Sequence, residues 1–193
     1  MSLHMSCEMR LPAWLDEFID DWQDPLETIE QRMHLAVTLA AENVKHQTGG
    51  PFGAIVVENK SSRLLSVGVN LVTSVELSLA HAEMVAVSLA QSALGNWNLG
   101  SADGVQLVTS CEPCAMCFGA VPWSGVTSIV WGASKEDAEE AGFDEGDKPA
   151  DWVDSLERRG IRTRGGVLHE EARAVLMRYA HRDDAIIYHP EKH

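Results

Sequence analysis

Pro113-Cys114-Ala115-Met116-Cys117 is the stretch of sequence that decides the fold and the chemistry of this chain. Two thiolates with this spacing at the start of a helix can share one metal ion, because the helix dipole and the free backbone N–H groups there stabilise negative sulfur. A third cysteine, Cys111, lies close by. Disulfide frameworks spread their cysteines to close loops, so this crowding favours a metal site, with small core residues as the other interpretation.

A metal site needs further ligands, and the sequence offers three His-x-Glu triplets: His81-Ala82-Glu83, His169-Glu170-Glu171 and His189-Pro190-Glu191. Their surroundings distinguish them. His81 lies in a small, apolar stretch that suits a dry metal pocket, whereas His169 begins a charged surface helix and His189 is close to the end of the chain. Residues i and i+2 are about 200° apart around a helix, so His81 and Glu83 can address one site only from a helix end. A helix is predicted to start near His81.

One histidine, two cysteines and an open position are typical of a catalytic zinc site. Zinc lowers the pKa of bound water to about 7, which provides a zinc-bound hydroxide as nucleophile at neutral pH. Glu83, charged and not a ligand, would then carry protons to the substrate. The pattern H-x-E with P-C-x-x-C downstream is the signature of zinc deaminases. A closed structural site would need Cys111 as a fourth ligand, but Pro113 forces the residue before it to be extended, which favours Cys111 at a strand end.

The composition bounds the class of protein. The chain has 193 residues and a formal charge of −14, which fits one domain of ordinary size. We expect an N-terminal extension with a short acidic helix at residues 1–25 and a single zinc deaminase domain at residues 26–193. The acidity argues against nucleic acid or an anionic membrane as partner, because both would repel it. No apolar run reaches the ~18 residues that span a bilayer, and no signal peptide is recognisable, so we expect a cytoplasmic protein with reduced thiols.

Apolar periodicity and turn residues predict alternating helices and strands. Strands are expected at 52–58 and 64–69, which form a hairpin, and at 105–109, 126–131 and 161–164. Helices are expected at 12–22, from Asp24-Pro25 to Gly49-Gly50, and at 81–94, 114–121, 135–141, 151–159 and 169–179, with Pro122 disturbing the fourth. Residues 70–80 and 142–150 are predicted loops. This order predicts an α/β protein with a three-layer α/β/α fold, in which helices cover both faces of a mixed five-stranded central sheet.

Several motifs together resemble one known family. They are Gly49-Gly50-Pro51-Phe52-Gly53-Ala54, Val69-Asn70, Ala80-His81-Ala82-Glu83, Thr109-Ser110-Cys111-Glu112-Pro113-Cys114-Ala115-Met116-Cys117, Trp123 and Glu140-Ala141-Gly142-Phe143-Asp144-Glu145-Gly146. On these motifs the chain resembles the cytidine-deaminase-like superfamily and, within it, the bacterial guanine deaminases, over roughly residues 29–188. The zinc motif is shared across the superfamily, whereas the Thr-Ser-Cys-Glu-Pro-Cys form and the Ala-Gly-Phe-Asp-Glu loop are narrower and look like guanine deaminase.

The resemblance implies the cytidine-deaminase-like fold and the hydrolysis of guanine to xanthine and ammonia, with one Zn²⁺ per subunit held by His81, Cys114 and Cys117. Glu83 would be the proton shuttle, and Cys111 would belong to the framework without touching zinc. Either Asp144 or Glu145 would read the base and help to protonate the leaving amine, with Glu145 the closer match. A solvated acidic loop is the other interpretation of this pair.

The resemblance also implies residues that bind the base. Asn70 would hydrogen-bond the base edge, and Phe52, Ala82 and Trp123 would line its flat slot. Plain core packing is the other interpretation of Phe52 and Trp123, and a turn at the end of a strand is that of Asn70.

The implied assembly is a homodimer, in which a C-terminal segment that includes Ile186-Ile187-Tyr188-His189 covers the active site or crosses to the neighbour's. Other substrates stay open, among them guanosine, ammeline or another s-triazine, and cytosine. A tRNA adenosine deaminase would want a basic surface, which a chain of this charge lacks. A zinc-stabilised scaffold without catalysis is the most distant alternative.

Overall fold

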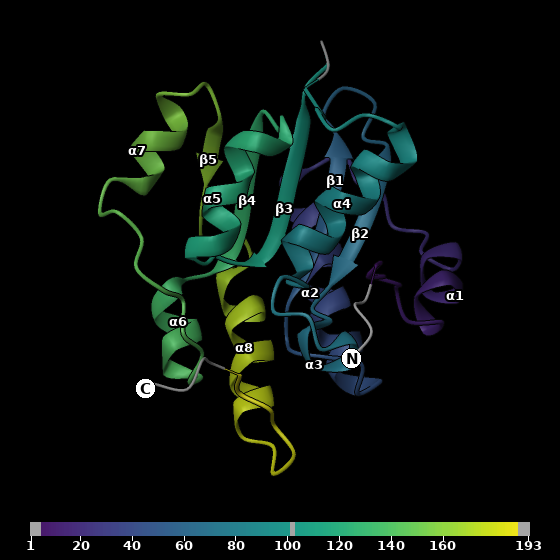
Figure 1. The fold of residues 1–193 in the computed structure, drawn as a ribbon, viewed down its shortest axis with the longest axis vertical. Helices are drawn as coiled ribbons and strands as arrows, with labels where there is room; N and C mark the ends of the chain where they lie inside the picture. Colours follow the sequence, from purple (N-terminus) through teal and green to yellow (C-terminus); the bar gives the residue numbers. More distant parts are fainter. Residues whose placement is uncertain (1–4, 101–102, 189–193) are drawn as a thin grey trace.

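The computed structural model of this protein describes residues 5–100 and 103–188 (Figure 1). Its five strands form one sheet in the order β2-β1-β3-β4-β5. They are β1 (Gly53–Glu58), β2 (Leu64–Val69), β3 (Val105–Cys111), β4 (Ser128–Ala133) and β5 (Arg162–Arg164). β1 pairs antiparallel with β2 and β3, whereas β3, β4 and β5 run parallel. The predicted hairpin and the mixed five-stranded sheet are therefore confirmed.

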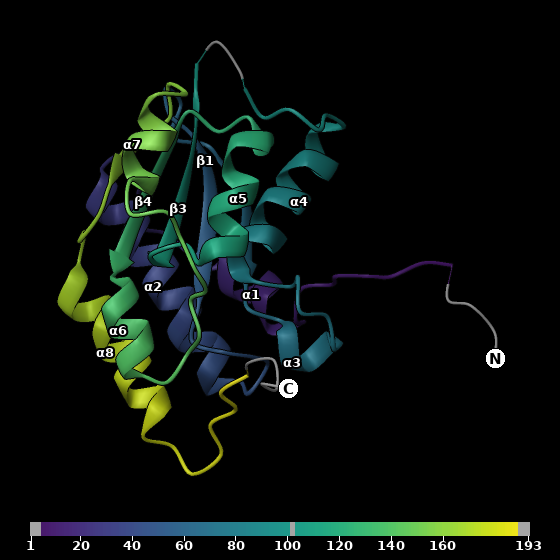
Figure 2. The same ribbon diagram turned by 60° about the vertical axis from the view of Figure 1, so that its left-hand side comes forward.

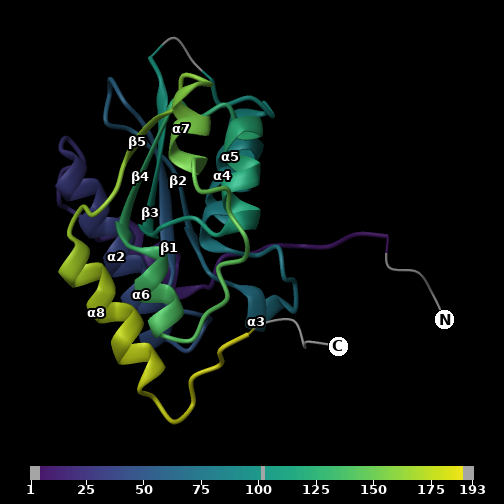
Figure 3. The same cartoon turned by 90° about the vertical axis from the view of Figure 1, so that its left-hand side faces the viewer.

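Helices cover both faces of the sheet, as the edge-on view shows (Figure 3). One face carries α2 (Ile29–Lys45) and α8 (His169–Ala180), with α6 (Lys135–Glu140) beside α8. The other carries α4 (Ala82–Leu94), α5 (Ala115–Ser124) and α7 (Trp152–Glu157), with α5 between the other two in the turned view (Figure 2). Two short helices, α1 (Trp14–Asp20) and α3 (Val72–Val75), complete the set in the described residues. The three-layer α/β/α prediction is confirmed.

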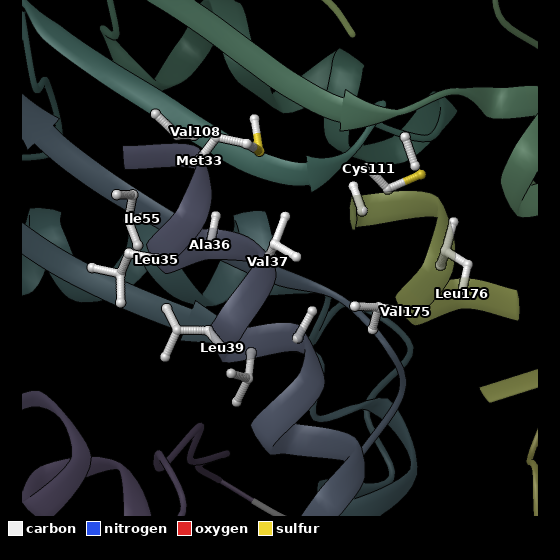
Figure 4. Packing of buried hydrophobic residues seen from close by; sticks show 14 of the residues in the cluster. Met33, Leu35, Ala36, Val37, Leu39, Ile55, Val108, Cys111, Val175 and Leu176 are labelled. Carbon is white, nitrogen blue, oxygen red and sulfur yellow. The ribbon is translucent and has the colours of Figure 1, made fainter. Parts of the chain in front are cut away.

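Side chains alternate between the two faces of each strand and build two buried clusters. On β1, Ile55 and Val57 pack toward α2 and α8, whereas Ala54 and Val56 pack toward α4. The first cluster joins α2 to β3 and α8, and Figure 4 shows it from close by. In the second cluster, the small residues of α4 let this helix lie against β2: a Cβ on Gly68 would stand 2.2 Å from the carbonyl oxygen of Ala82. This close approach fixes where α4 begins.

Two helices, α2 and α5, have boundaries more than two residues from the prediction. α2 begins at Ile29 and not at Pro25, because Thr28 caps it: the Thr28 hydroxyl accepts from the backbone N–H of Gln31, and the Gln31 side chain accepts in return from Thr28. α5 continues through Pro122 to Ser124, although proline lacks the N–H that would bond to the carbonyl oxygen four residues earlier, and the helix ends at Gly125 with φ 83°. Residues 126 and 127 then turn the chain into the sheet, so β4 starts two residues later than expected.

The N-terminal extension packs on the rest of the chain. Leu15 of α1 is only 2% exposed and belongs to the same buried cluster as α2. The loop predicted at 70–80 contains the short helix α3. Within the described residues, none of the helices is long and apolar enough to cross a membrane.

Candidate active site

The three predicted zinc ligands come from the starts of two neighbouring helices. His81 is the residue directly before α4, Cys114 is the residue directly before α5, and Cys117 lies in the first turn of α5. His81 and Cys114 both have extended backbones, and neither side chain caps its own helix. The side chains are therefore free to converge in front of the two helix ends, where the helix dipoles favour negative sulfur.

The spacing of the ligand atoms fits zinc. His81 Nδ1 lies 3.6 Å from Cys114 Sγ and 3.6 Å from Cys117 Sγ. Zn–N and Zn–S bonds of about 2.05 and 2.3 Å at a tetrahedral angle place nitrogen and sulfur about 3.6 Å apart. A hydrogen bond from Cys117 and the proximity of His81 lower the pKa of Cys114 to about 4, which supplies a thiolate. Zinc binds at His81, Cys114 and Cys117.

Cys111 does not belong to this group. It ends β3, is buried, and its thiol donates to the carbonyl oxygen of Ser134 at 3.6 Å. Burial raises the pKa of Cys111 well above its ordinary value, so it stays a thiol. Three ligands leave a position open, which distinguishes this site from a closed structural one.

Two buried carboxyl groups face the zinc ligands. Glu83, in the first turn of α4, is 7% exposed, and Glu145, in the loop after α6, is 6% exposed. Burial raises the pKa of Glu83, and the charge of Cys114 adds to this shift. Burial also raises the pKa of Glu145 to about 8, and the charges of Cys114 and Glu83 add to that shift. Glu145 Oε2 is the buried side-chain oxygen that lacks a hydrogen-bond partner among the described residues. A buried acceptor without a partner is costly, so this atom is a candidate contact for a ligand.

A cavity lies between these groups. Its wall combines the zinc ligands and carboxyl groups with aromatic rings, and its lining residues are Phe52, His81, Glu83, Cys111, Glu112, Cys114, Phe143, Asp144, Glu145 and Tyr188. Phe52 and Phe143 meet edge to face with ring centroids 4.9 Å apart. Flat apolar walls with a few polar groups suit a small aromatic heterocycle.

Hydrogen bonds and an ion pair join the loop that carries Glu145 to the start of α5 and to the residues just before it. The backbone N–H of Ala115 donates to the carbonyl oxygen of Glu145 at 2.9 Å. Lys148 forms an ion pair with Glu112 and donates to the carbonyl oxygen of Pro113 at 2.7 Å. The Lys148 side chain is only 3% exposed, and its ammonium lies 4.7 Å from the ring centre of Trp152. These contacts hold Glu145 next to Cys114.

Asp144 and Glu145 have different surroundings. Asp144 is exposed, and its Oδ1 accepts from the backbone N–H of Gly146 at 2.9 Å, which is a local turn contact. Glu145 points inward. The geometry therefore favours Glu145 as the second carboxyl group of the site, with Asp144 at the rim.

Asn70 is connected to the cavity by a hydrogen bond to Tyr188, which lines it. Asn70 is fully buried after β2, and its Nδ2 donates to the Tyr188 hydroxyl at 2.6 Å. The Tyr188 ring lies edge-on to His81, with centroids 5.9 Å apart. Tyr188 belongs to the C-terminal segment that the resemblance assigns to the site, and its side chain lines the cavity of its own chain. His189 lies outside the described residues.

Two of the expected base contacts are not at the cavity. Ala82 is fully buried in the packing between α4 and the sheet, because its position after His81 turns its side chain inward. Trp123 is 80% exposed near the far end of α5 from Cys114. Neither residue is among those that line the cavity of its own chain, so their contact with the base stays a prediction.

The triplet at His169 does not contribute a ligand to the group at His81, Cys114 and Cys117. His169 lies at the surface, where its Nε2 is 2.7 Å from Asp137 and its Nδ1 is 3.2 Å from Glu170. The triplet at His189 lies outside the described residues. The sequence predicted no role for Phe143 or Lys148. Phe143 lies inside the motif from Glu140 to Gly146, which could have indicated it, whereas Lys148 lies outside every motif named above.

Known proteins match the chain closely. The model of the cytidine and deoxycytidylate deaminase zinc-binding region matches residues 26–133. Guanine deaminase of Bacillus subtilis is 43% identical over 122 residues, which are 60% of this chain and 75% of that protein. The structure of guanine deaminase from Nitrosomonas europaea superposes with a TM-score of 0.85 at 40% identity, over 93% of this chain and 99% of that chain. The structure of NE0047 in complex with 2,6-diaminopurine gives a TM-score of 0.86 at 41% identity, over 94% and 96% of the two chains.

These matches agree with the geometry of the site. The segment matched by the family model contains His81, Cys114, Cys117 and Glu83. It covers more than half of the chain, and the structural matches extend over nearly all of it. The protein is therefore a member of the cytidine and deoxycytidylate deaminase zinc-binding family.

Proposed function

We propose that this protein hydrolyses guanine to xanthine and ammonia. The observation that carries the proposal is Oε2 of Glu145, which is buried beside Glu83 and the zinc ligands and has no hydrogen-bond partner in the part of the chain that the structure describes. An aromatic amine leaves poorly unless it is protonated, so a second buried carboxyl group suits this reaction. The relatives that match most of the chain are named guanine deaminases, and NE0047 holds 2,6-diaminopurine, which supports a purine base as substrate.

Zinc in a site with three protein ligands and an open position lowers the pKa of bound water to about 7, which makes hydroxide available at neutral pH. Glu83 lies two residues after the ligand His81, at the cavity wall. We assign to its carboxylate the transfer of the water proton to N3 of the base as the C2–O bond forms. Burial raises the pKa of Glu83, which suits a group that must both accept and give up a proton.

Glu145 is assigned to the leaving amine. Burial raises the pKa of Glu145, which favours its protonated form. When zinc is bound, its charge offsets the negative charge of Cys114. Burial is then the cause of the raised Glu145 pKa that persists in the zinc-loaded enzyme. The carboxylic acid would give its proton to the 2-amino group as the C2–N bond breaks and ammonia leaves. The proton of the new C2 hydroxyl would pass back to the buried carboxyl groups as the C2 carbonyl forms, which restores protonated Glu145.

The remaining wall positions the base. Phe52 and Phe143 supply flat apolar surface, and the Asn70 amide supplies a hydrogen-bonding group where Tyr188 now accepts its bond. We propose that a base edge takes this bond in the complex. Asp144 stays at the rim of the slot.

We further propose a homodimer in the cytoplasm. Trp97 and Trp123 are 76% and 80% exposed after α4 and near the end of α5, and large apolar groups of this kind are enriched at protein interfaces. The zinc thiolates need a reducing compartment, which supports the location. Crossing of the C-terminal segment to a partner stays a prediction, and sedimentation of the purified protein tests the dimer.

The test is a substrate panel. Zinc-loaded protein is incubated separately with guanine, guanosine, ammeline, cytosine and adenine, and product formation is followed in each. Xanthine formation with guanine as the preferred substrate is expected, and no xanthine above background would overturn the proposal. Glu83→Gln should keep zinc and lose turnover. Glu171→Gln, which alters the exposed triplet at His169, should behave as the wild type.

A further inference from the structure

A chain of hydrogen bonds connects the N-terminal helix α1 to the wall of the base slot. The indole Nε1 of Trp14 donates to the hydroxyl of Thr48 at 3.0 Å. That hydroxyl donates in turn to Oδ1 of Asn43 at 2.7 Å. Asn43 lies in α2 and is fully buried. The two contacts fix which end of the Asn43 amide points away from α1.

The other end of this amide holds two backbone segments. Asn43 Nδ2 donates to the carbonyl oxygen of Gly50 and to that of Asn70, both at 2.9 Å. Gly50 also accepts from the backbone N–H of Phe52 at 2.9 Å, and Asn70 donates its own N–H to the carbonyl of Phe52 at 3.0 Å. The side-chain amide of Asn43 therefore holds the backbone just before Phe52 and the backbone of Asn70 in place.

The segments are packed too tightly to move independently. A Cβ on Gly49 would stand 1.8 Å from the carbonyl oxygen of Asn70 and 3.0 Å from Asn43 Nδ2, so only glycine fits there. If the amide of Asn43 lost its orientation, two buried carbonyl groups would lose their partner. The adjoining backbone would then relax, and with it the side chain of Asn70.

We infer that Asn43 is a positioning residue for base recognition, and that Trp14 of the N-terminal extension keeps it oriented through Thr48. The inference rests on the proposed function, in which Asn70 and Phe52 contact the base. Asn43 does not line the cavity, so it acts on the base only through these two residues. The N-terminal extension thereby contributes to the substrate site, although none of its described residues lines the cavity.

Thr48 offers matched variants. Thr48→Val keeps the shape of the side chain and removes the hydroxyl, whereas Thr48→Ser keeps the hydroxyl. Thr38→Val is the control, because the Thr38 hydroxyl donates to the carbonyl oxygen of His34 in its own helix at 2.8 Å and takes no part in the chain of bonds. Trp14→Phe removes the N–H and keeps an aromatic ring to stack on His46, and it serves if Thr48→Val fails to fold.

The measurements are steady-state kinetics with guanine, zinc content, and the side-chain amide signals of ¹⁵N-labelled protein. For Thr48→Val we expect KM to rise about fivefold to tenfold with kcat within about twofold, because binding of the base is lost in the ground state and transition state alike. Thr48→Ser should restore KM, Thr38→Val should leave it unchanged, and zinc content should be constant. The amide signal of Asn70 should shift in Thr48→Val and Trp14→Phe.

The inference is overturned if KM of Thr48→Val stays within about twofold of the wild type, or if Thr48→Ser is as impaired as Thr48→Val. An unmoved amide signal of Asn70 also overturns it. These failures are distinct from failure of the proposed function, in which the wild type itself would release no xanthine. In that case the amide signals still report whether Thr48 orients Asn70.

Discussion

The ion pair between Lys148 and Glu112 gives a prediction with a calculable size. Lys148→Met removes a buried ammonium, 3% exposed, and leaves the 13% exposed carboxylate of Glu112 without its cation. Breaking a buried pair in this way costs about 3–5 kcal/mol. The melting temperature of a domain of this size falls by about 2–4 °C per kcal/mol, so a decrease of about 6–20 °C is expected.

The assay is thermal denaturation followed by circular dichroism, on zinc-loaded protein at one concentration. Lys148→Met/Glu112→Gln should recover at least half of the loss, because no buried charge is left unpaired. Lys60→Met is the matched control: its partner Asp103 is at 3.2 Å, but Lys60 is 76% exposed, and exposed pairs contribute at most about 1 kcal/mol. If Lys148→Met melts within 2 °C of Lys60→Met, with the margin set by about 0.5–1 kcal/mol of stability, the reasoning about this pair is wrong.

Further predictions concern the second carboxyl group, the surface ion pairs and the core. Glu145→Gln should lower kcat about 10²-fold to 10⁴-fold, as loss of a general acid does, while metal analysis shows unchanged zinc; unaltered kcat would exclude its role as proton donor. The hydrogen bond to Asp137 raises the pKa of His169, so its stabilising contribution is complete below the unfolded pKa of about 6.5 and is lost as pH rises through the folded value. Accordingly, the difference in melting temperature between wild type and His169→Gln should shrink from pH 6 to pH 9, and a constant difference would contradict this. Leu39→Ala, at a fully buried position of α2, should cost about 2–5 kcal/mol in urea denaturation, and a cost below about 1 kcal/mol would show that the site collapses around the smaller side chain.

Local sequence signals were sufficient for the zinc ligands. The Pro-Cys-x-x-Cys spacing and the apolar surroundings of His81 both predict ligands at helix starts, and those starts are set by residues next to the ligands themselves. The hairpin and the alternation of the strands follow from patterns of a few residues, so they were predictable as well. The strand order and the register were not predicted, because they depend on pairing between strands that are far apart in the chain, such as β1 with β3.

The parts that differ from the prediction have both local and long-range causes. Pro25 is a plausible helix start, but Thr28 and Gln31 together satisfy each other's backbone N–H groups and fix the start at Ile29. Trp123 stands near the zinc motif in sequence, yet α5 carries it away from the cavity. Lys148 could not be assigned, because its partners Glu112 and Trp152 meet it only after the loop folds back on α5.

The separation of the zinc ligands along the chain also affects which part of the protein unfolds locally when the metal is removed. His81 and Cys114 are 33 residues apart, and the stretch between them contains α4 and β3. A metal ion that joins them closes a loop of that length, so it restricts the chain much as a covalent cross-link would. Hydrogen exchange should show this as a cooperative unit: on chelation, amides of α4 and the start of α5 would lose protection together, while α2 and α8 on the opposite face keep theirs.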